Sequence, residues 1–287
     1  MKPDVRAFFD GDTNTVTYVA TDPASKVCAI IDPVLDFDQA SGRTSTNSAD
    51  AVMAFVHDQG LEVAWILETH AHADHLSAAS YLKSKTAAKI GTGKLITHVQ
   101  RTFKKIFNLG DQFTANGDPF DCLLDDDDRL PLGTMEIRVM HTPGHTPACV
   151  TFVVGDAAFV GDTLFMPDYG TARVDFPGGD AVTLYRSIQR IFGLPATTRL
   201  FMCHDYKAAG RDEYAWESSV EEESATNIHI HRGITEQEFV DFRYHRDAGL
   251  GMPKLILPSI QVNIRAGEMP PADDNGIVYL RLPVDAL

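Results

Sequence analysis

A segment of seven residues, 69–75, reads T-H-A-H-A-D-H, and one residue separates it from an apolar run at 63–67. Three imidazole groups and a carboxylate in such close sequence are costly to bury unless a positive ion lies among them. Neutral imidazole and carboxylate form the ligand set that zinc and non-haem iron prefer. The segment therefore predicts a metalloenzyme, while the metal, the number of ions and the reaction stay open at this point.

The composition narrows the class of protein. Of the 287 residues, 44% are apolar, which is enough for a sizeable core. A formal net charge of -15 argues against nucleic-acid binding, because an acidic surface repels phosphate groups. The four cysteines are far apart, which favours reduced thiols, and no apolar run approaches the ~20 residues of a membrane span. We therefore expect a cytoplasmic protein that binds neither nucleic acid nor membranes.

Strands and helices are predicted to alternate, with candidate metal ligands where strands end. Periodicity and turn residues predict strands at 15–19, 27–31, 63–67, 135–141, 149–154, 157–160 and 199–203. Helices are predicted at 49–59, with Ser48 as N-cap and Gly60 as stop, and at 76–85. Further metal candidates follow the later strands: His145, Asp162 and His204. We expect an α/β sandwich whose loops meet at one site.

The spacing inside the histidine segment suits one ion or two. Histidines at i and i+2 point to the same side of an extended segment, so His70 and His72 can share an ion. Asp74 and His75 then turn toward a neighbouring position. A second H-x-H pair at 229–231 precedes T-E-Q-E (235–238), a capping box, which favours a helix lead-in over a ligand pair.

Four motifs in this order resemble those of the metallo-β-lactamase superfamily: T-H-A-H-A-D-H (69–75), T-P-G-H-T (142–146), G-D (161–162) and C-H-D-Y (203–206). The resemblance implies an α/β fold, the αββα sandwich, with the metal site between its two sheets. It also implies a single domain over residues 1–287, with a C-terminal extension from about 225 to 287 packed on it. The reaction stays open, because the superfamily includes thioester hydrolases, nucleases, lactonases and oxygenases.

Further segments are similar to those of persulfide dioxygenases: G-T-A-R-V-D-F (170–176), S-S-V-E-E-E (218–223) and M-P-K-L-I-L-P (252–258). The chain as a whole is most similar to the bacterial β-lactamase-like hydrolase subgroup, which is associated with sulfide detoxification. An insert at 207–217 departs from the mitochondrial type of this family, and the sequence assigns it no role.

Carried over by motif, the resemblance implies one Fe(II) per chain, bound by His70, His145 and Asp162. Two histidines and one carboxylate leave coordination positions open, as in non-haem Fe(II) oxygenases. The implied reaction is oxidation of glutathione persulfide by O₂ to sulfite and glutathione, in a homodimer.

The resemblance also gives roles to the neighbouring residues. Those that would orient ligands or bond to oxygen are His72, Asp74, His75 and His204. Arg173 would pair with a glutathione carboxylate, although a structural ion pair with Asp175 or Asp180 is the alternative. Tyr206 would position substrate or oxygen.

Hydrolysis is the alternative function. This reaction would use two zinc or two iron ions that generate hydroxide for attack on a glutathione thioester or a lactone. The ions would be held by His70, His145 and Asp162 together with His72, Asp74, His75 and His204. The segments at 170–176 and 252–258 favour the dioxygenase.

Overall fold

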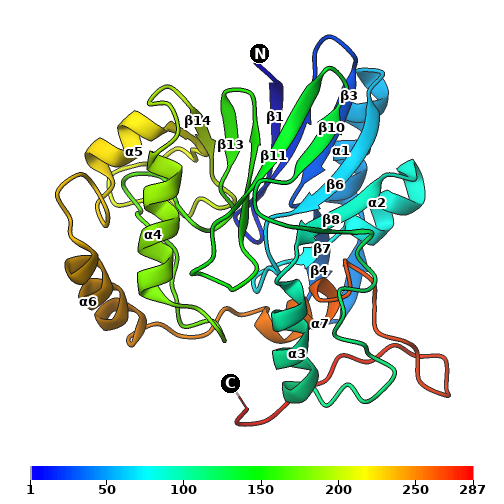
Figure 1. Cartoon of the computed structure of the whole chain (residues 1–287). Helices are drawn as coiled ribbons and strands as arrows, with labels where there is room; N and C mark the ends of the chain where they lie inside the picture. Colours follow the sequence, from blue (N-terminus) through cyan, green and yellow to red (C-terminus); the bar gives the residue numbers. More distant parts are fainter. Residues whose placement is uncertain (1, 287) are drawn as a thin grey trace.

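The computed structural model describes residues 2–286 and contains two six-stranded sheets that pack against each other (Figure 1). The first sheet has the order β1 (Asp4–Asp10), β2 (Thr15–Thr21), β3 (Val27–Ile31), β6 (Glu62–Glu68), β8 (Lys89–Gly93), β9 (Cys122–Leu124). The second has the order β10 (Arg129–Leu132), β11 (Met135–His141), β12 (Val150–Val154), β13 (Ala157–Phe159), β14 (Arg199–Phe201), β15 (Glu217–Ser219). A small third sheet joins β5 (Arg43–Ser45), β4 (Val34–Asp38) and β7 (Leu76–Ser77).

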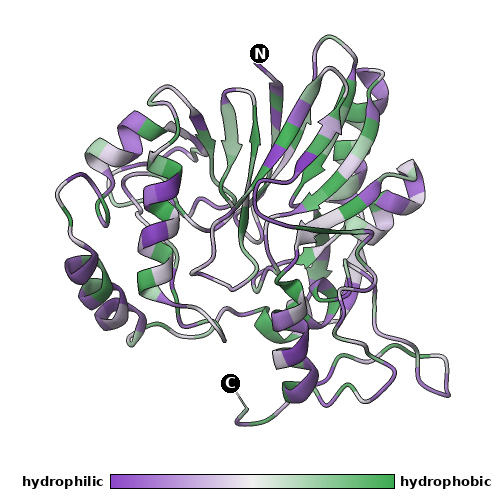
Figure 2. Cartoon of the chain, in the orientation of Figure 1, coloured by the Kyte–Doolittle hydropathy of each residue, from purple (hydrophilic) through white to green (hydrophobic). Residues whose placement is uncertain are grey.

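Helices cover the outer face of each large sheet. Those packed on the first sheet are α1 (Asn47–Asp58), α2 (Ala79–Thr86), α3 (Ile96–Ile106) and α7 (Ile256–Asn263). Those packed on the second are α4 (Ala181–Phe192), α5 (Val220–Thr226) and α6 (Glu236–Asp247). Figure 2 shows largely apolar central strands, and helices such as α4 that carry both apolar and polar residues. This is the predicted αββα arrangement.

Strand β2 illustrates why the layers form. All seven of its residues are buried, because alternate side chains of a strand point to opposite faces and both faces are covered. Val16 and Tyr18 belong to the apolar cluster between the two sheets, whereas Val19 belongs to the cluster under the helices of the first sheet. The predicted strands are confirmed to within two residues at each end.

The two predicted helices begin elsewhere than expected. Helix α1 begins at Asn47, and Ser48 lies inside it, where its hydroxyl donates to Asp36 Oδ1 (2.5 Å) instead of capping the helix. Helix α2 begins at Ala79, because Leu76 and Ser77 pair with β4. The predicted stop at Gly60 is confirmed, with a left-handed φ of 62° that glycine adopts at no steric cost.

The last sixty residues contact both helical layers. Helix α6 packs against α4 on the second sheet, and α7 contacts β7 beside the first sheet. The division of the chain into a domain and an extension stays a prediction.

Among residues 2–286, no helix has both the length and the apolar character needed to cross a membrane. All four cysteines are free thiols, as predicted.

Glu223 on α5 gives a testable pH dependence. Its side chain is buried, Oε2 accepts a hydrogen bond from Asn227 Nδ2 (2.7 Å), and burial raises the pKa of the carboxyl group from 4.5 to about 8. The folded chain therefore binds this proton more tightly than the unfolded chain, so the free energy of unfolding falls as pH rises from about 5 to 8. We expect Glu223→Gln to flatten that fall, by up to about 1.4 kcal/mol per pH unit.

The measurement is urea denaturation at several pH values between 5 and 9. Glu221→Gln, at an exposed position of the same helix, is the matched control. An equal change of slope in the control, or an unchanged slope in Glu223→Gln, would contradict the assignment to Glu223.

Candidate metal centre

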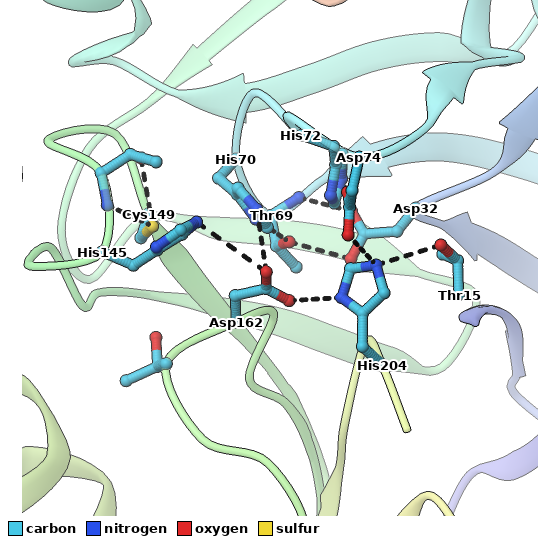
Figure 3. Close-up of polar contacts among 12 residues, drawn as sticks. Thr15, Asp32, Thr69, His70, His72, Asp74, His145, Cys149, Asp162 and His204 are labelled. Atoms are coloured by element: carbon cyan, nitrogen blue, oxygen red, sulfur yellow. Dashed lines mark hydrogen bonds and ion pairs between the residues drawn. The ribbon is translucent and has the colours of Figure 1, made fainter. Parts of the chain in front are cut away.

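Loops at the ends of four strands meet between the two sheets and place their polar side chains together (Figure 3). The histidine segment follows β6, and His145 lies in the turn after β11. Asp162 and His204 follow β13 and β14, which pair in parallel and so end at the same edge of the second sheet. The predicted convergence at strand ends is therefore what the structure shows.

Three of these side chains form a triad with one donor atom each directed to a common point. Asp162 Oδ2 lies 3.8 Å from His70 Nε2 and 3.8 Å from His145 Nε2. Two donors that each lie about 2.1 Å from one ion are separated by roughly 3 to 4 Å. All three side chains are buried, and His70 Nε2 has no hydrogen-bond partner among the described residues. The triad therefore fits a single metal ion.

The neighbours of His70 fix which of its nitrogens faces the triad. The hydroxyl of Thr69 donates to Asp32 Oδ2 (2.8 Å), so its oxygen is left to accept a hydrogen bond from His70 Nδ1 (3.0 Å). The proton thus resides on Nδ1, and the lone pair of Nε2 is free to bind a metal. Burial, helped by the charges of two neighbouring histidines, also holds the pKa of His70 well below its usual value, which keeps the ring neutral.

His145 is oriented in the same way. Its Nδ1 donates to the backbone carbonyl of Arg173 (2.8 Å), so that Nε2 faces Asp162. The backbone of segment 170–175, and not its side chains, thereby orients His145.

His204 lies between two carboxylates and is turned into a hydrogen-bond donor on both sides. Its Nδ1 contacts Asp162 Oδ1 at 2.6 Å, and its Nε2 contacts Asp74 Oδ2 at 2.7 Å. Burial alone would lower the pKa of His204, but the negative charges of Asp162 and Asp74 raise it well above the usual value. In this arrangement both ring nitrogens of His204 face carboxylates, and the contact with Oδ1 leaves Asp162 Oδ2 directed toward the triad.

One nitrogen of His72 also contacts two carboxylates, while its Nδ1 has no hydrogen-bond partner among the described residues. Its Nε2 contacts Asp32 Oδ1 at 3.0 Å and Glu68 Oε2 at 3.2 Å. Burial disfavours a charged ring here too, yet the carboxylate of Asp32 raises the pKa of His72 well above its usual value. Sequence reasoning missed Asp32 and Glu68, although Asp32 ends a strand as the other site residues do.

Asp74 and His75 complete the predicted set. Asp74 Oδ1 contacts His75 Nδ1 at 3.3 Å, and the donor atoms of His72, Asp74 and His75 lie within 4.8 Å of one another. The side chain of Asn263 on α7 donates to the backbone carbonyls of His72 and His75, at 2.8 Å each, and so holds the loop. The histidine segment is thus divided between the triad and a neighbouring group.

The triad opens into a cleft of about 570 Å³. His145, Asp162 and Asp74 lie on its lining, which also contains Phe165, Tyr169, Arg173, Tyr206, Arg246 and Lys254. The structure therefore places both predicted substrate contacts, Arg173 and Tyr206, at the cleft. Tyr206 stacks parallel to the ring of His204, with centroids 5.7 Å apart, and donates to Asp74 Oδ2 (3.3 Å).

Arg173 is already paired within the chain. Its Nε and Nη2 donate to the two carboxylate oxygens of Asp175, and Nη1 donates to the carbonyl of Gly251 (2.7 Å). The structural ion pair that the sequence left as the alternative is thus present, and a substrate role for Arg173 stays a prediction. The histidines at 229–231 are a helix lead-in as expected, since Thr235 and Glu238 form a capping box.

Fold and site together define the class of protein: an αββα metalloenzyme with histidine and aspartate ligands at strand ends. The profile of the Metallo-beta-lactamase superfamily matches residues 10–204. The protein therefore belongs to the metallo-β-lactamase superfamily.

Individual relatives agree with this assignment. A probable metallo-hydrolase of Burkholderia pseudomallei (strain 1710b) is 55% identical over 294 residues, which cover 99% of each chain. A beta-lactamase hydrolase-like protein of Agrobacterium fabrum is 53% identical over 285 residues, and the match spans 99% of this chain but 65% of that protein. The mitochondrial persulfide dioxygenase ETHE1 of Bos taurus is 30% identical over 272 residues, or 93% and 91% of the two chains.

A solved structure is also similar over nearly the whole chain. The crystal structure of ETHE1 from Myxococcus xanthus superposes with a TM-score of 0.74 at 28% sequence identity, covering 92% of this chain and 100% of that one. The resemblance to persulfide dioxygenases and to bacterial β-lactamase hydrolase-like proteins is thus confirmed.

Proposed function

We propose that this protein is a persulfide dioxygenase, which uses O₂ and water to oxidise glutathione persulfide to sulfite and glutathione. One Fe(II) per chain would be bound by His70, His145 and Asp162. The observation that carries the proposal is that these residues direct three donor atoms to one point, while His72 and His204 each contact two carboxylates. Two histidines and a carboxylate are the ligands of non-haem Fe(II) oxygenases.

The bound iron would supply the one-electron chemistry that lets O₂ react. The residues around it have separate tasks. His204 keeps Asp162 in one orientation through the bond to Oδ1, and Thr69 keeps the proton of His70 on Nδ1. Tyr206, at the mouth of the cleft, places a hydroxyl beside Asp74, where it can bond to substrate.

Charges on the cleft support an anionic organic substrate. Arg246 and Lys254 line it, and among residues 2–286 neither forms an ion pair with a carboxylate. Glutathione carries two carboxylates, which could pair with these two side chains. They suit this task better than Arg173, whose guanidinium is bonded to Asp175.

Hydrolysis by two metal ions is the second candidate, and one observation favours it. His72, Asp74 and His75 lie within 4.8 Å of one another, and His72 Nδ1 and His75 Nε2 are buried without hydrogen-bond partners among the described residues. A relative named as a probable metallo-hydrolase is 55% identical. The carboxylate contacts of these rings are made by the opposite nitrogens, so His72 Nδ1 and His75 Nε2 are the atoms through which a second ion would bind.

Anaerobic purification followed by metal analysis and an oxygen electrode separates the two functions. We expect one iron per chain, and O₂ uptake that depends on glutathione persulfide and is matched by sulfite. The physical reason is that a triad of one carboxylate and two neutral imidazoles completes one site only. Two zinc ions per chain, with thioester turnover and no O₂ uptake, would establish the hydrolase instead.

A further inference from the structure

An arginine in the insert at 207–217 joins two segments of the cleft. Nη1 and Nη2 of Arg211 donate to the carboxylate of Asp205 at 2.6 and 2.7 Å. Nε and Nη2 of the same side chain donate to Asp168 at 2.7 and 3.1 Å. One guanidinium group thus forms a two-pronged contact with each of two carboxylates, a geometry that its planar fork permits and that a lysine cannot reproduce.

Each of these aspartates directly precedes a tyrosine of the cleft. Tyr169 follows Asp168 and Tyr206 follows Asp205, and the two rings pack with centroids 5.3 Å apart. Phe165 contacts both rings, at 5.6 and 6.0 Å between centroids. We call Phe165, Tyr169 and Tyr206 the aromatic wall, since all three line the cleft beside Asp162.

The contact between Arg211 and Asp205 is the buried half of this link. Asp205 is 1% exposed, and its carboxylate also accepts hydrogen bonds from the backbone N–H groups of Lys207 (3.3 Å) and Ala215 (2.9 Å). Without Arg211, a buried carboxylate would have only these backbone donors, and its segment would move to reach water. Tyr206 would move with it, because it is the adjacent residue.

We propose that Arg211 is a positioning residue that holds the aromatic wall in place and thereby sets the affinity of the cleft for its ligand. The inference rests on the proposed function, in which that ligand is the glutathione part of the persulfide. Arg211 is not among the residues that line the cleft, so it acts through Tyr169 and Tyr206. None of its contacts involves His70, His145 or Asp162, and His204, the residue before Asp205, is held by its own contacts with Asp162 and Asp74.

The test compares iron-loaded wild-type protein with Arg211→Met and Arg211→Lys. We expect KM for glutathione persulfide and Kd for glutathione, measured by calorimetry, to rise about tenfold in both variants. Turnover at saturation should stay within about twofold, because the aromatic wall binds the substrate but does not react. Iron content should equal that of the wild type.

Arg199→Met is the matched control. Arg199 also holds a carboxylate with two nitrogens, contacting Asp156 at 3.3 and 2.9 Å, and its side chain is 18% exposed against 20% for Arg211. It lies outside the cleft, so its loss should leave KM and Kd unchanged. Asp168→Asn, at a position that is 41% exposed, weakens only the link to Tyr169 and should give a smaller rise in KM.

A double-mutant cycle tests the route of the effect. If Arg211 acts through Tyr206, Arg211→Met should weaken glutathione binding far less in a Tyr206→Ala background than in the wild type. Additive effects would overturn the proposal, as would wild-type Kd and KM in both Arg211 variants. A wild-type protein that neither binds glutathione nor oxidises its persulfide would instead overturn the proposed function, and this inference with it.

Discussion

Replacing Asp162 with alanine is expected to abolish iron binding and turnover. Asp162 supplies the one carboxylate oxygen of the triad, 3.8 Å from the Nε2 atoms of His70 and His145. Its loss leaves two neutral imidazoles and removes the negative charge that offsets a divalent ion. We expect less than about one tenth of an iron per chain, and turnover reduced at least about 1000-fold, because the metal supplies the reaction chemistry.

Metal analysis of anaerobically purified protein measures this directly. Asp162→Asn keeps the shape of the side chain and separates loss of charge from loss of packing. Asp121→Ala, which breaks a surface contact with Lys83 (2.6 Å), is the control and should retain its iron. A full complement of iron in Asp162→Ala would remove Asp162 from the ligand set.

Replacing Asp32 with alanine should have the largest effect on stability. Asp32 is 2% exposed and accepts hydrogen bonds from the backbone and hydroxyl of Thr69, at 2.7 and 2.8 Å, and from His72 (3.0 Å). Its removal leaves the buried ring of His72 without the nearer of its two carboxylate contacts and frees the hydroxyl of Thr69. Removing one partner of such a buried ion pair lowers the free energy of unfolding by about 3–5 kcal/mol.

The same substitution should weaken the metal site from a distance. Without Asp32, the hydroxyl of Thr69 can donate to His70 Nδ1, which shifts the ring proton to Nε2 and removes the lone pair that faces the triad. Loss of such an outer contact reduces metal affinity about 10–100-fold.

Urea denaturation of the metal-free variant, followed by iron titration, measures both effects. Asp156→Ala breaks a half-exposed ion pair with Arg199 and should cost less than about 1 kcal/mol. An Asp32 variant as stable as this control would show that the contacts of Asp32 with His72 and Thr69 do not stabilise the fold.

Much of the fold follows from local sequence pattern. The alternation of apolar residues and the turn residues after each run locate the strands, and strand-end motifs locate His70, His145, Asp162 and His204 together. Such motifs work because a loop after a buried strand can present polar side chains without disturbing the sheet.

Contacts between segments far apart in sequence could not be predicted in this way. That Asp32 bonds to His72 depends on β3 pairing with β6 in a register that aligns Ile31 with Leu67. The start of α2 depends on the pairing of Leu76 and Ser77 with β4, and the backbone of Ser77 also donates to the side chain of Asn263 (2.8 Å). Sheet order and helix docking decide both, and neither is encoded in a local pattern.

Asn263 has a consequence for the order in which the site can be assembled. Its amide bonds to the carbonyls of His72 and His75, which precede it by 191 and 188 residues. During synthesis, the ligands of the histidine segment therefore emerge long before the residue that fixes their loop, and this contact forms only after Asn263 has been made. The loop that carries His72 and His75 is thus fixed only once α7 has docked.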